Sequence, residues 1–160
     1  MHNRVAFFDI DGVLADDSHR VEHALAKRWD SYFLLSAVAA DTVWPQGRQA
    51  LEQAQAEGWE IAYLTGRRED LRATTANWLL LNHFPAGILH MRPCGVKKPL
   101  ANLKADILTS IHAVSEKTQL VLYDDDPEVI RLVRSLLGVH SAVHCTWHIK
   151  QQALVRTAVV

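Results

Sequence analysis

The feature that most constrains this chain is a regular alternation of short apolar runs with apolar residues at helical spacing. Five runs predict strands, at about residues 4–10, 60–65, 87–91, 119–123 and 142–145. The clearest of them are continuously apolar, which is typical of strands that helices cover on both faces. Strands that alternate with helices favour a mostly parallel sheet. The sequence therefore predicts an α/β fold.

Cap residues indicate where several of the helices begin and end. Gly58 suits the left-handed position that follows a helix. Asp126 followed by Pro127 is typical of a helix N-terminus, and Gly138 is expected to end the same helix. Another helix is predicted by an apolar stripe of Leu100, Leu103, Ile107, Ile111 and Val114.

One segment, residues 18–45, interrupts the alternation after the first strand. We expect one or two helices there, because apolar and aromatic residues recur at Val21, Leu25, Trp29, Tyr32 and Phe33. A segment this short cannot build a core of its own. It is therefore predicted to be a small helical lid or flap, and residues 1–160 are expected to form one domain.

Composition and charge exclude several classes of protein. No stretch of 18 apolar residues is present, so no transmembrane helix is expected. The 17 Lys and Arg against 18 Asp and Glu exclude a protein that holds nucleic acid by bulk charge, although not one with a locally basic site. The start of the chain lacks signal-peptide features, and Cys94 and Cys145 are too few for a disulfide framework. A cytoplasmic location is expected.

Two carboxylates, Asp9 and Asp11, stand at the C-terminal end of the first predicted strand, in the run FFDIDGVL. Ligands of open α/β sheets bind at the carboxyl ends of the strands. Neighbouring acids repel each other unless a proton or a cation compensates, and Mg²⁺ prefers oxygen ligands. The pair therefore indicates a cation site, and the alternative is that both acids only cap the loop after the strand.

A second acidic group follows the predicted strand at 119–123. Three consecutive acids stand there, and Asp126 is explained as the helix cap, whereas Asp124 and Asp125 are not. Like charges at one strand end are unfavourable without a cation. Asp124 and Asp125 therefore also point to a metal site.

Residues suited to a phosphoryl group lie between the two acidic groups. Thr65, Gly66 and Arg67 stand at the end of the second predicted strand, where a hydroxyl and backbone N–H groups can donate to phosphate oxygens. Lys104 closes a stretch that begins at Arg92 and contains no acid. The alternatives are a common Thr-Gly-Arg turn and a solvated basic loop.

The combination resembles the haloacid dehalogenase superfamily of phosphotransferases over about residues 5–139. That superfamily has four motifs, which are matched in order by Asp9 with Asp11, Thr65, Lys104, and Asp124 with Asp125. The first of them has the pattern D-x-D-G-[TV]-[LV]. The resemblance implies a Rossmann-like parallel sheet with the strand order 5-4-1-2-3.

A narrower resemblance is to the 3′-phosphatase domain of polynucleotide kinase-phosphatases. It is carried by LTGR at 64–67, T-x-x-W-L at 75–79 and L-x-M-R at 89–92, followed by Lys104 and the YDD run. The sequence departs from the pattern at Ala101, where the family often has an acid. No G-x-x-x-x-G-K-[ST] loop occurs, so no attached kinase domain is expected.

The resemblance implies a role for each site residue. Asp9, which leaves the rigid strand directly, would be the nucleophile that forms an aspartyl-phosphate, and Asp11 would be the general acid and base. Thr65 and Lys104 would hold the phosphoryl oxygens. Mg²⁺ would be bound by Asp9, the backbone carbonyl of Asp11, and Asp125, with Asp124 acting through water or hydrogen bonds. Substrate-binding residues would be Gly66, Arg67 and Arg92.

The expected substrate is the 3′-phosphorylated end of a DNA or RNA strand, and the alternative is a nucleotide or another small phosphomonoester. A receiver-type signalling domain also combines acids, Mg²⁺, Thr and Lys. Receivers place the Lys last, however, whereas Lys104 precedes the second acid pair. The sequence carries no indication of oligomeric state.

Two further residue groups have alternative interpretations. His140, His144 and His148 are spaced by four, as zinc ligands on a helix would be, but the segment is predicted as a strand. Trp29 or Tyr32 could stack on a base, as in single-strand binders, although packing within the lid is the favoured interpretation.

Overall fold

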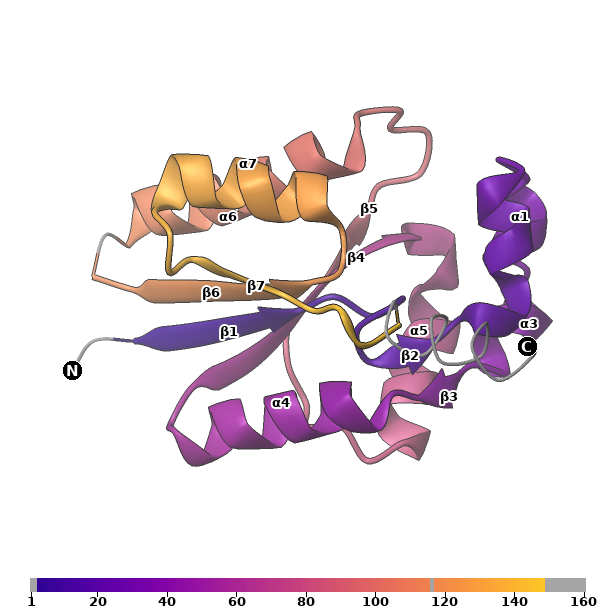
Figure 1. The fold of residues 1–160 in the computed structure, drawn as a ribbon, viewed down its shortest axis with the longest axis horizontal. Coiled ribbons are helices and arrows are strands. Elements are labelled where there is room, and N and C mark those ends of the chain that lie inside the picture. The colour runs from indigo at the N-terminus through magenta and orange to yellow at the C-terminus, as the bar shows by residue number, and fades with distance from the viewer. Residues whose placement is uncertain (1–2, 116, 149–160) are drawn as a thin grey trace, which may run out of the picture.

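The central sheet of this computed structural model, which describes residues 3–115 and 117–148, is parallel and five-stranded. Its order is β5-β4-β1-β6-β7 (Figure 1). When these five strands are numbered 1 to 5 along the chain and read from β7, this is the predicted order 5-4-1-2-3. The strands are β1 (Arg4–Phe8), β4 (Glu60–Arg68), β5 (Leu89–Arg92), β6 (Gln119–Asp124) and β7 (Ala142–His144). The Rossmann-like fold predicted from the sequence is therefore confirmed.

Helices cover both faces of the sheet, which explains the continuously apolar strands (Figure 1). One face carries α4 (Pro45–Ala56) and α5 (Arg72–Leu81), which follows the 3₁₀ turn η2 (Glu69–Leu71). The other carries α6 (Leu100–Val114) and α7 (Pro127–Leu137). Successive side chains of β1 alternate between the two layers, with Phe8 in the α4/α5 core and Phe7 in the α6/α7 core.

The predicted cap residues lie at the helix ends. The Asp126 side chain accepts a hydrogen bond from the Glu128 backbone N–H at 2.8 Å, and Pro127 is the first residue of α7. Gly138 ends α7 with a φ of 98°. These short-range signals were sufficient because each one acts within a single turn of helix.

The buried face of α6 is offset by about one residue from the predicted apolar stripe, of which Ile107 and Ile111 are half-buried against the same core. The buried positions are Ala101, Lys104, Ala105 and Leu108. Val114, which we expected on the buried face, is 90% exposed. Two alanines let the helix lie close to the sheet, and the acids described below compensate the charge of Lys104. Helix α6 therefore presents a lysine where the apolar pattern alone places leucine and isoleucine.

The segment 18–45 is built from shorter pieces than we expected. It contains the 3₁₀ turn η1 (Ser18–Arg20), then α1 (Val21–Leu25), α2 (Trp29–Tyr32) and α3 (Leu35–Ala39). Strand β3 (Thr42–Val43) pairs antiparallel with β2 (Ala15–Asp16), a small sheet that we did not predict. Lys27 has a positive φ of 56° and separates α1 from α2. Three short helices therefore replace the expected one or two, and we call this segment the lid.

The lid lies beyond the carboxyl end of β1, where Figure 1 shows α1 and α3. In the described part of the chain, no helix has the length and apolar character needed to cross a membrane.

Candidate active site

The loop after β1 turns sharply at Gly12. Gly12 has a φ of +77°, and a Cβ at this position would lie 2.3 Å from Oδ2 of Asp125. Both the backbone conformation and the close approach of the Asp125 carboxylate therefore require glycine. The backbone N–H of Asp9 donates to the carbonyl of Tyr123 at 2.9 Å, which holds the start of this loop against β6.

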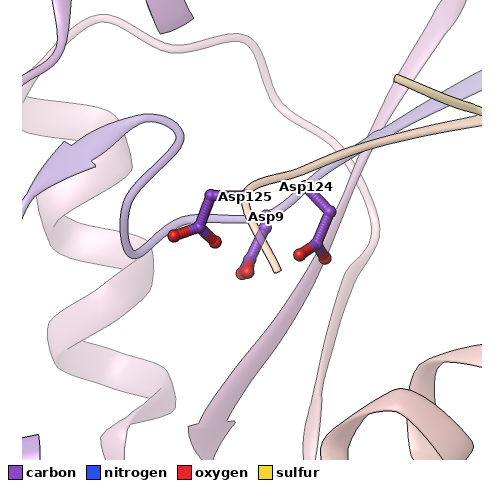
Figure 2. Close-up of side chains that lie close together, drawn as sticks. All are labelled: Asp9, Asp124 and Asp125. Carbon is purple, nitrogen blue, oxygen red and sulfur yellow. The ribbon is translucent and has the colours of Figure 1, made fainter. Parts of the chain in front are cut away.

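Three carboxylates meet at this edge of the sheet. Oxygens of Asp9, Asp124 and Asp125 all lie within 4.8 Å of one another. Figure 2 shows the three side chains side by side, with Asp9 between the other two. The parallel register pairs Phe8 with Tyr123, so the residues that follow them, Asp9 and Asp124, are neighbours across two strands. The two acidic motifs, far apart in sequence, therefore form one cluster.

Lys104 joins this cluster from α6. Its Nζ donates to Oδ2 of Asp9 and to Oδ2 of Asp124, each at 2.6 Å, and its side chain is fully buried. Burial lowers the pKa of a lysine, but the two carboxylates outweigh burial and raise the pKa of Lys104. The ammonium is therefore charged and fixed between two acids.

Burial disfavours the ionised forms of two of the carboxyl groups. It raises the pKa of Asp9 to about 7, where Asp124 adds to the effect and Lys104 opposes it. Burial, with Asp9 and Asp124 nearby, raises the pKa of Asp125 to about 8. Three carboxylates and one ammonium have a net charge of −2 when all are ionised. The donor set, which consists of oxygens only, and this charge fit a divalent cation such as Mg²⁺.

Asp11 does not join the three clustered carboxylates. Its Oδ1 accepts from Nη2 of Arg20 at 2.5 Å and from Nη2 of Arg67 at 2.6 Å. Burial alone would raise the pKa of Asp11, but the two guanidinium groups lower it to about 2. Asp11 is therefore ionised and held in one orientation, beside the cluster rather than within it.

Arg20 and Arg67 share a second carboxylate, that of Asp41. Oδ2 of Asp41 accepts from Nη2 of Arg20 at 2.6 Å and from Nη2 of Arg67 at 2.7 Å. The side chains of Asp41 and Arg67 are fully buried, and that of Arg20 is 1% exposed. Two carboxylates and two guanidinium groups thus form a neutral network. We call Asp11, Arg20, Asp41 and Arg67 the arginine–aspartate network.

Sequence reasoning missed Arg20 and Asp41. Neither belongs to a motif that we identified, and both lie in the lid segment, where the apolar spacing drew attention to other residues. The only signal was that this segment contains charged residues next to its apolar ones. A buried ion pair between distant residues leaves no periodic pattern in the sequence.

The other predicted site residues differ in what they contact. Thr65 is buried, and its Oγ1 accepts from the backbone N–H of Arg67 at 3.2 Å. A Cβ at Gly66 would lie 3.1 Å from the Leu100 side chain, so this glycine lets α6 approach β4. Arg92 donates to the carbonyls of Val96 and Lys98 and shapes the loop before α6.

For Arg67 the structure favours a different role from the predicted one. We expected its side chain to bind the substrate, but all of it is buried, and its guanidinium contacts Asp11, Asp41 and Thr75. The Arg67 guanidinium therefore contacts the site through Asp11. Substrate contacts of Gly66 and Arg92 remain predictions.

Two of the three spaced histidines, His144 and His148, lie close to Asp125. Nε2 of His144 is 3.0 Å from the backbone carbonyl of Asp125, and Nε2 of His148 is 4.0 Å from Oδ2 of Asp125. Within residues 3–115 and 117–148, the one group with the spacing of metal ligands is that of Asp9, Asp124 and Asp125. His144 therefore supports the backbone of the loop that carries Asp125.

Comparison with known proteins shows which family the chain matches. The model of the polynucleotide kinase PNKP phosphatase domain matches residues 3–144. No curated protein matches the chain. One similar solved structure is that of the Pnkp1/Rnl/Hen1 RNA repair complex, with a TM-score of 0.71 and 18% identity over 89% of this chain. The match spans 42% of the matched chain in that complex.

Other solved structures share the fold at lower identity. The class C acid phosphatase from Bacillus anthracis with tungstate bound has a TM-score of 0.57 and 13% identity, over 90% of this chain and 66% of that one. A haloacid dehalogenase-like hydrolase from Streptococcus pneumoniae has a TM-score of 0.58 and 13% identity, over 84% and 81%. At these identities the similarity shows a common fold.

The family model matches almost the whole described chain, and the motifs of the haloacid dehalogenase superfamily bring their acids and lysine together at one edge of the sheet. The chain therefore belongs to the family of polynucleotide kinase PNKP phosphatase domains, which are phosphatases of the haloacid dehalogenase type.

Proposed function

We propose that this protein is a Mg²⁺-dependent phosphomonoesterase that removes the terminal phosphate from the 3′ end of a polynucleotide through an aspartyl-phosphate on Asp9. The observation that supports this most directly is the juxtaposition of Asp9, Lys104, Asp124 and Asp125 beside an ionised, fixed Asp11. Such an arrangement combines a nucleophile, a cation and a proton-transfer group in one site, which phosphate monoester hydrolysis needs because the uncatalysed reaction is extremely slow.

In the first step, an oxygen of Asp9 attacks phosphorus and forms a new O–P bond, while the bond from phosphorus to the 3′ oxygen breaks. The departing oxygen takes a proton from Asp11. Lys104 stays between Asp9 and Asp124 and stabilises negative charge on the phosphoryl oxygens together with Thr65. The product of this step is the strand with a free 3′ hydroxyl.

In the second step, water attacks phosphorus of the aspartyl-phosphate, its proton passes to Asp11, and the bond to Asp9 breaks to release phosphate. The network favours the ionised Asp11 that this step needs as a base, because Arg20 and Arg67 hold its pKa at about 2. The first step needs the protonated form. A phosphate dianion beside Asp11 raises its pKa, since like charges disfavour a second anion.

Mg²⁺ would be held by Asp9, Asp125 and the backbone carbonyl of Asp11, with Asp124 as a further oxygen donor. When bound, it supplies Lewis-acid stabilisation of the negative charge on the phosphoryl group. The fit rests on the three carboxylate oxygens within 4.8 Å of one another and on their excess negative charge.

The proposed substrate class rests on the family. The matched family model describes the phosphatase domain of a polynucleotide kinase, and the similar solved chain is part of an RNA repair complex. A 3′-phosphorylated strand of DNA or RNA is therefore the proposed partner of this site.

A substrate panel tests this proposal. We expect faster release of phosphate, by kcat/KM, from a 3′-phosphorylated oligonucleotide than from the matching 3′-mononucleotide, and loss of both activities in EDTA with recovery in Mg²⁺. Preference for the mononucleotide would mean that the substrate is a small phosphomonoester and not a polynucleotide. A protein that stays phosphorylated without turnover would instead support a receiver-type role.

The raised pKa values predict how stability depends on pH and metal. The ordinary pKa of both groups is 3.8, and the pKa in the folded state is about 7 for Asp9 and about 8 for Asp125. At pH values between these limits, the folded state holds more protons than the unfolded state. In EDTA the stabilisation that comes from these bound protons is therefore present at low pH and is lost as the pH rises through the folded-state pKa values. Because Mg²⁺ binds the ionised carboxylates, we expect it to raise Tm more at about pH 8 than at about pH 5.5.

Thermal unfolding at both pH values, with Mg²⁺ or EDTA, measures this difference. Asp125→Asn is the matched variant and should remove most of the Mg²⁺-dependent increase in Tm. An increase that is the same at both pH values would contradict the proposed coupling between protons and metal.

A further inference from the structure

Resting on the proposed function, we propose that Trp29, on lid helix α2, is a stacking platform for a base near the 3′ end of a single-stranded substrate. The proposal adds a specificity-determining residue to the site and concerns the nucleotide rather than the phosphate. Aromatic side chains are the usual platforms for unpaired bases, because every base has a π-face.

Trp29 is connected to the catalytic acid by a short series of contacts. Arg20 donates through Nη2 to Asp11 and through Nη1 to the backbone carbonyl of Tyr32, the latter at 3.2 Å. The ring centroids of Tyr32 and Trp29 are 6.0 Å apart in an edge-to-face arrangement. Only Arg20 and Tyr32 therefore lie between Trp29 and Asp11 in this series of contacts, which places Trp29 on the lid within two side chains of the proposed phosphate site.

The helix that carries Trp29 is attached to the site at two points. The Tyr32 hydroxyl donates to Oδ2 of Asp17 at 2.5 Å, and the Arg20 guanidinium lies 4.2 Å from the centre of the Tyr32 ring. On the other side, Nη1 of Arg68, the last residue of β4, makes a surface contact with Oδ1 of Asp30 at 3.2 Å, where the Asp30 side chain is 96% exposed. The contacts of Tyr32 hold one end of α2, so a platform on this helix loses less conformational freedom when a base binds.

Of the two lid aromatics considered from the sequence, the structure leaves only Trp29 accessible. Tyr32 is 7% exposed, and its hydroxyl and ring are both occupied by the contacts above. Trp29 is 51% exposed, and its packed side lies against Phe33, with ring centroids 6.4 Å apart and planes 25° apart. A tryptophan so exposed, yet supported from beneath by another ring, is suited to stacking on a further aromatic group.

The charges beside Trp29 complement a nucleic acid strand. Lys27 and Arg28, which directly precede it, are both exposed. Within the described residues, the Arg28 side chain contacts His23 and no carboxylate, whereas the acid that follows Trp29, Asp30, is paired with Arg68. Two cations are thus available to phosphodiester groups next to the aromatic ring, which favours a nucleotide over an apolar peptide as the occupant.

The test is a double-change cycle, in which kcat/KM is compared for wild type and variant on the intact strand and on a strand that lacks one base. The protein variants are Trp29→Ala and Trp29→Phe, and the substrates are a 3′-phosphorylated single-stranded oligonucleotide and the same strand with an abasic nucleotide at the last or the next-to-last position. We expect Trp29→Ala to lower kcat/KM on the intact strand by about 5- to 150-fold, mainly through KM. Trp29→Phe should restore most of this loss.

On the strand whose missing base is the one that stacks, Trp29→Ala should have little effect, because the interaction is already absent. Hydrolysis of glycerol 2-phosphate, which has neither a base nor another aromatic ring, should be unchanged and shows that the variant is folded. Leu25→Ala is the matched control, since Leu25 is an 81% exposed apolar residue of the lid on α1, and it should behave as the wild type on every substrate.

Two outcomes separate this inference from the proposed function. If the wild-type protein prefers the oligonucleotide but Trp29→Ala loses the same factor on intact and abasic strands, Trp29 does not stack on those bases and the inference is wrong. If the wild-type protein does not prefer the oligonucleotide at all, the proposed function fails, and the inference fails with it.

Discussion

Replacing Asp9 by asparagine is expected to lower phosphatase turnover by at least about 10³-fold, because the variant has no carboxylate to form the aspartyl-phosphate. The fold should be retained. Asn keeps one oxygen, which can accept from Lys104 or from the backbone N–H of Ile10 but not from both, and the change removes one of three crowded negative charges. We therefore expect a Tm close to that of the wild type in EDTA. Released phosphate and thermal unfolding measure the two effects.

Asp126→Asn is the control for this variant. Asp126 is the third acid of the run 124–126, next to the acid cluster, but its carboxylate caps α7, a role in which asparagine serves equally well. It should retain activity and stability. If Asp9→Asn kept near-normal turnover while folded, Asp9 could not be the nucleophile, and the assignment of the first motif would have to change.

The second large effect is expected for Asp41→Asn, which should lower the free energy of unfolding by about 3–5 kcal/mol. Its carboxylate is fully buried between Arg20 and Arg67, and the amide leaves two buried guanidinium groups with one carboxylate, that of Asp11. Urea unfolding with an unchanged m-value measures the loss. Phosphatase activity should fall as well, because the same two arginines orient Asp11.

Asp70→Asn is the matched comparison, because Asp70 also pairs with an arginine, Arg68, but at the surface, where the two side chains are 51% and 36% exposed. Exposed pairs contribute about 0–1 kcal/mol. The two variants should therefore differ by several-fold in their effect on stability. A loss below about 1 kcal/mol for Asp41→Asn would mean that the buried network contributes little net stabilisation.

The order of the motifs along the chain predicted the acid cluster through the resemblance to the haloacid dehalogenase superfamily. Strand, helix and turn signals are local, and in a parallel sheet the residues that end neighbouring strands must lie at one edge. The resemblance, through its strand order, makes the strands of Asp9 and Asp124 neighbours at that edge, and the register of β1 against β6 confirms it. The strand order was predicted through the resemblance and is also confirmed.

The internal structure of the lid could not be predicted in the same way. Its helices have four or five residues each, and none has a side-chain cap hydrogen bond. Helices this short have little stability of their own, so their ends depend on tertiary contacts. Arg20, Tyr32 and Asp41 supply such contacts in the lid, and all three are buried.

By itself, the sequence determined the layered α/β architecture and the strand ends that carry the acids, because each of these follows from spacing over a few residues, and the resemblance indicated which of these residues meet. Only the tertiary structure decided that Lys104 lies on the buried face of α6, that Arg67 points inward and that Asp11 is held by Arg20 and Arg67. These features are ion pairs between residues as far as 95 positions apart, as for Lys104 and Asp9. Electrostatic pairing over such separations leaves no periodic trace in the chain, and burial is what gives it its strength.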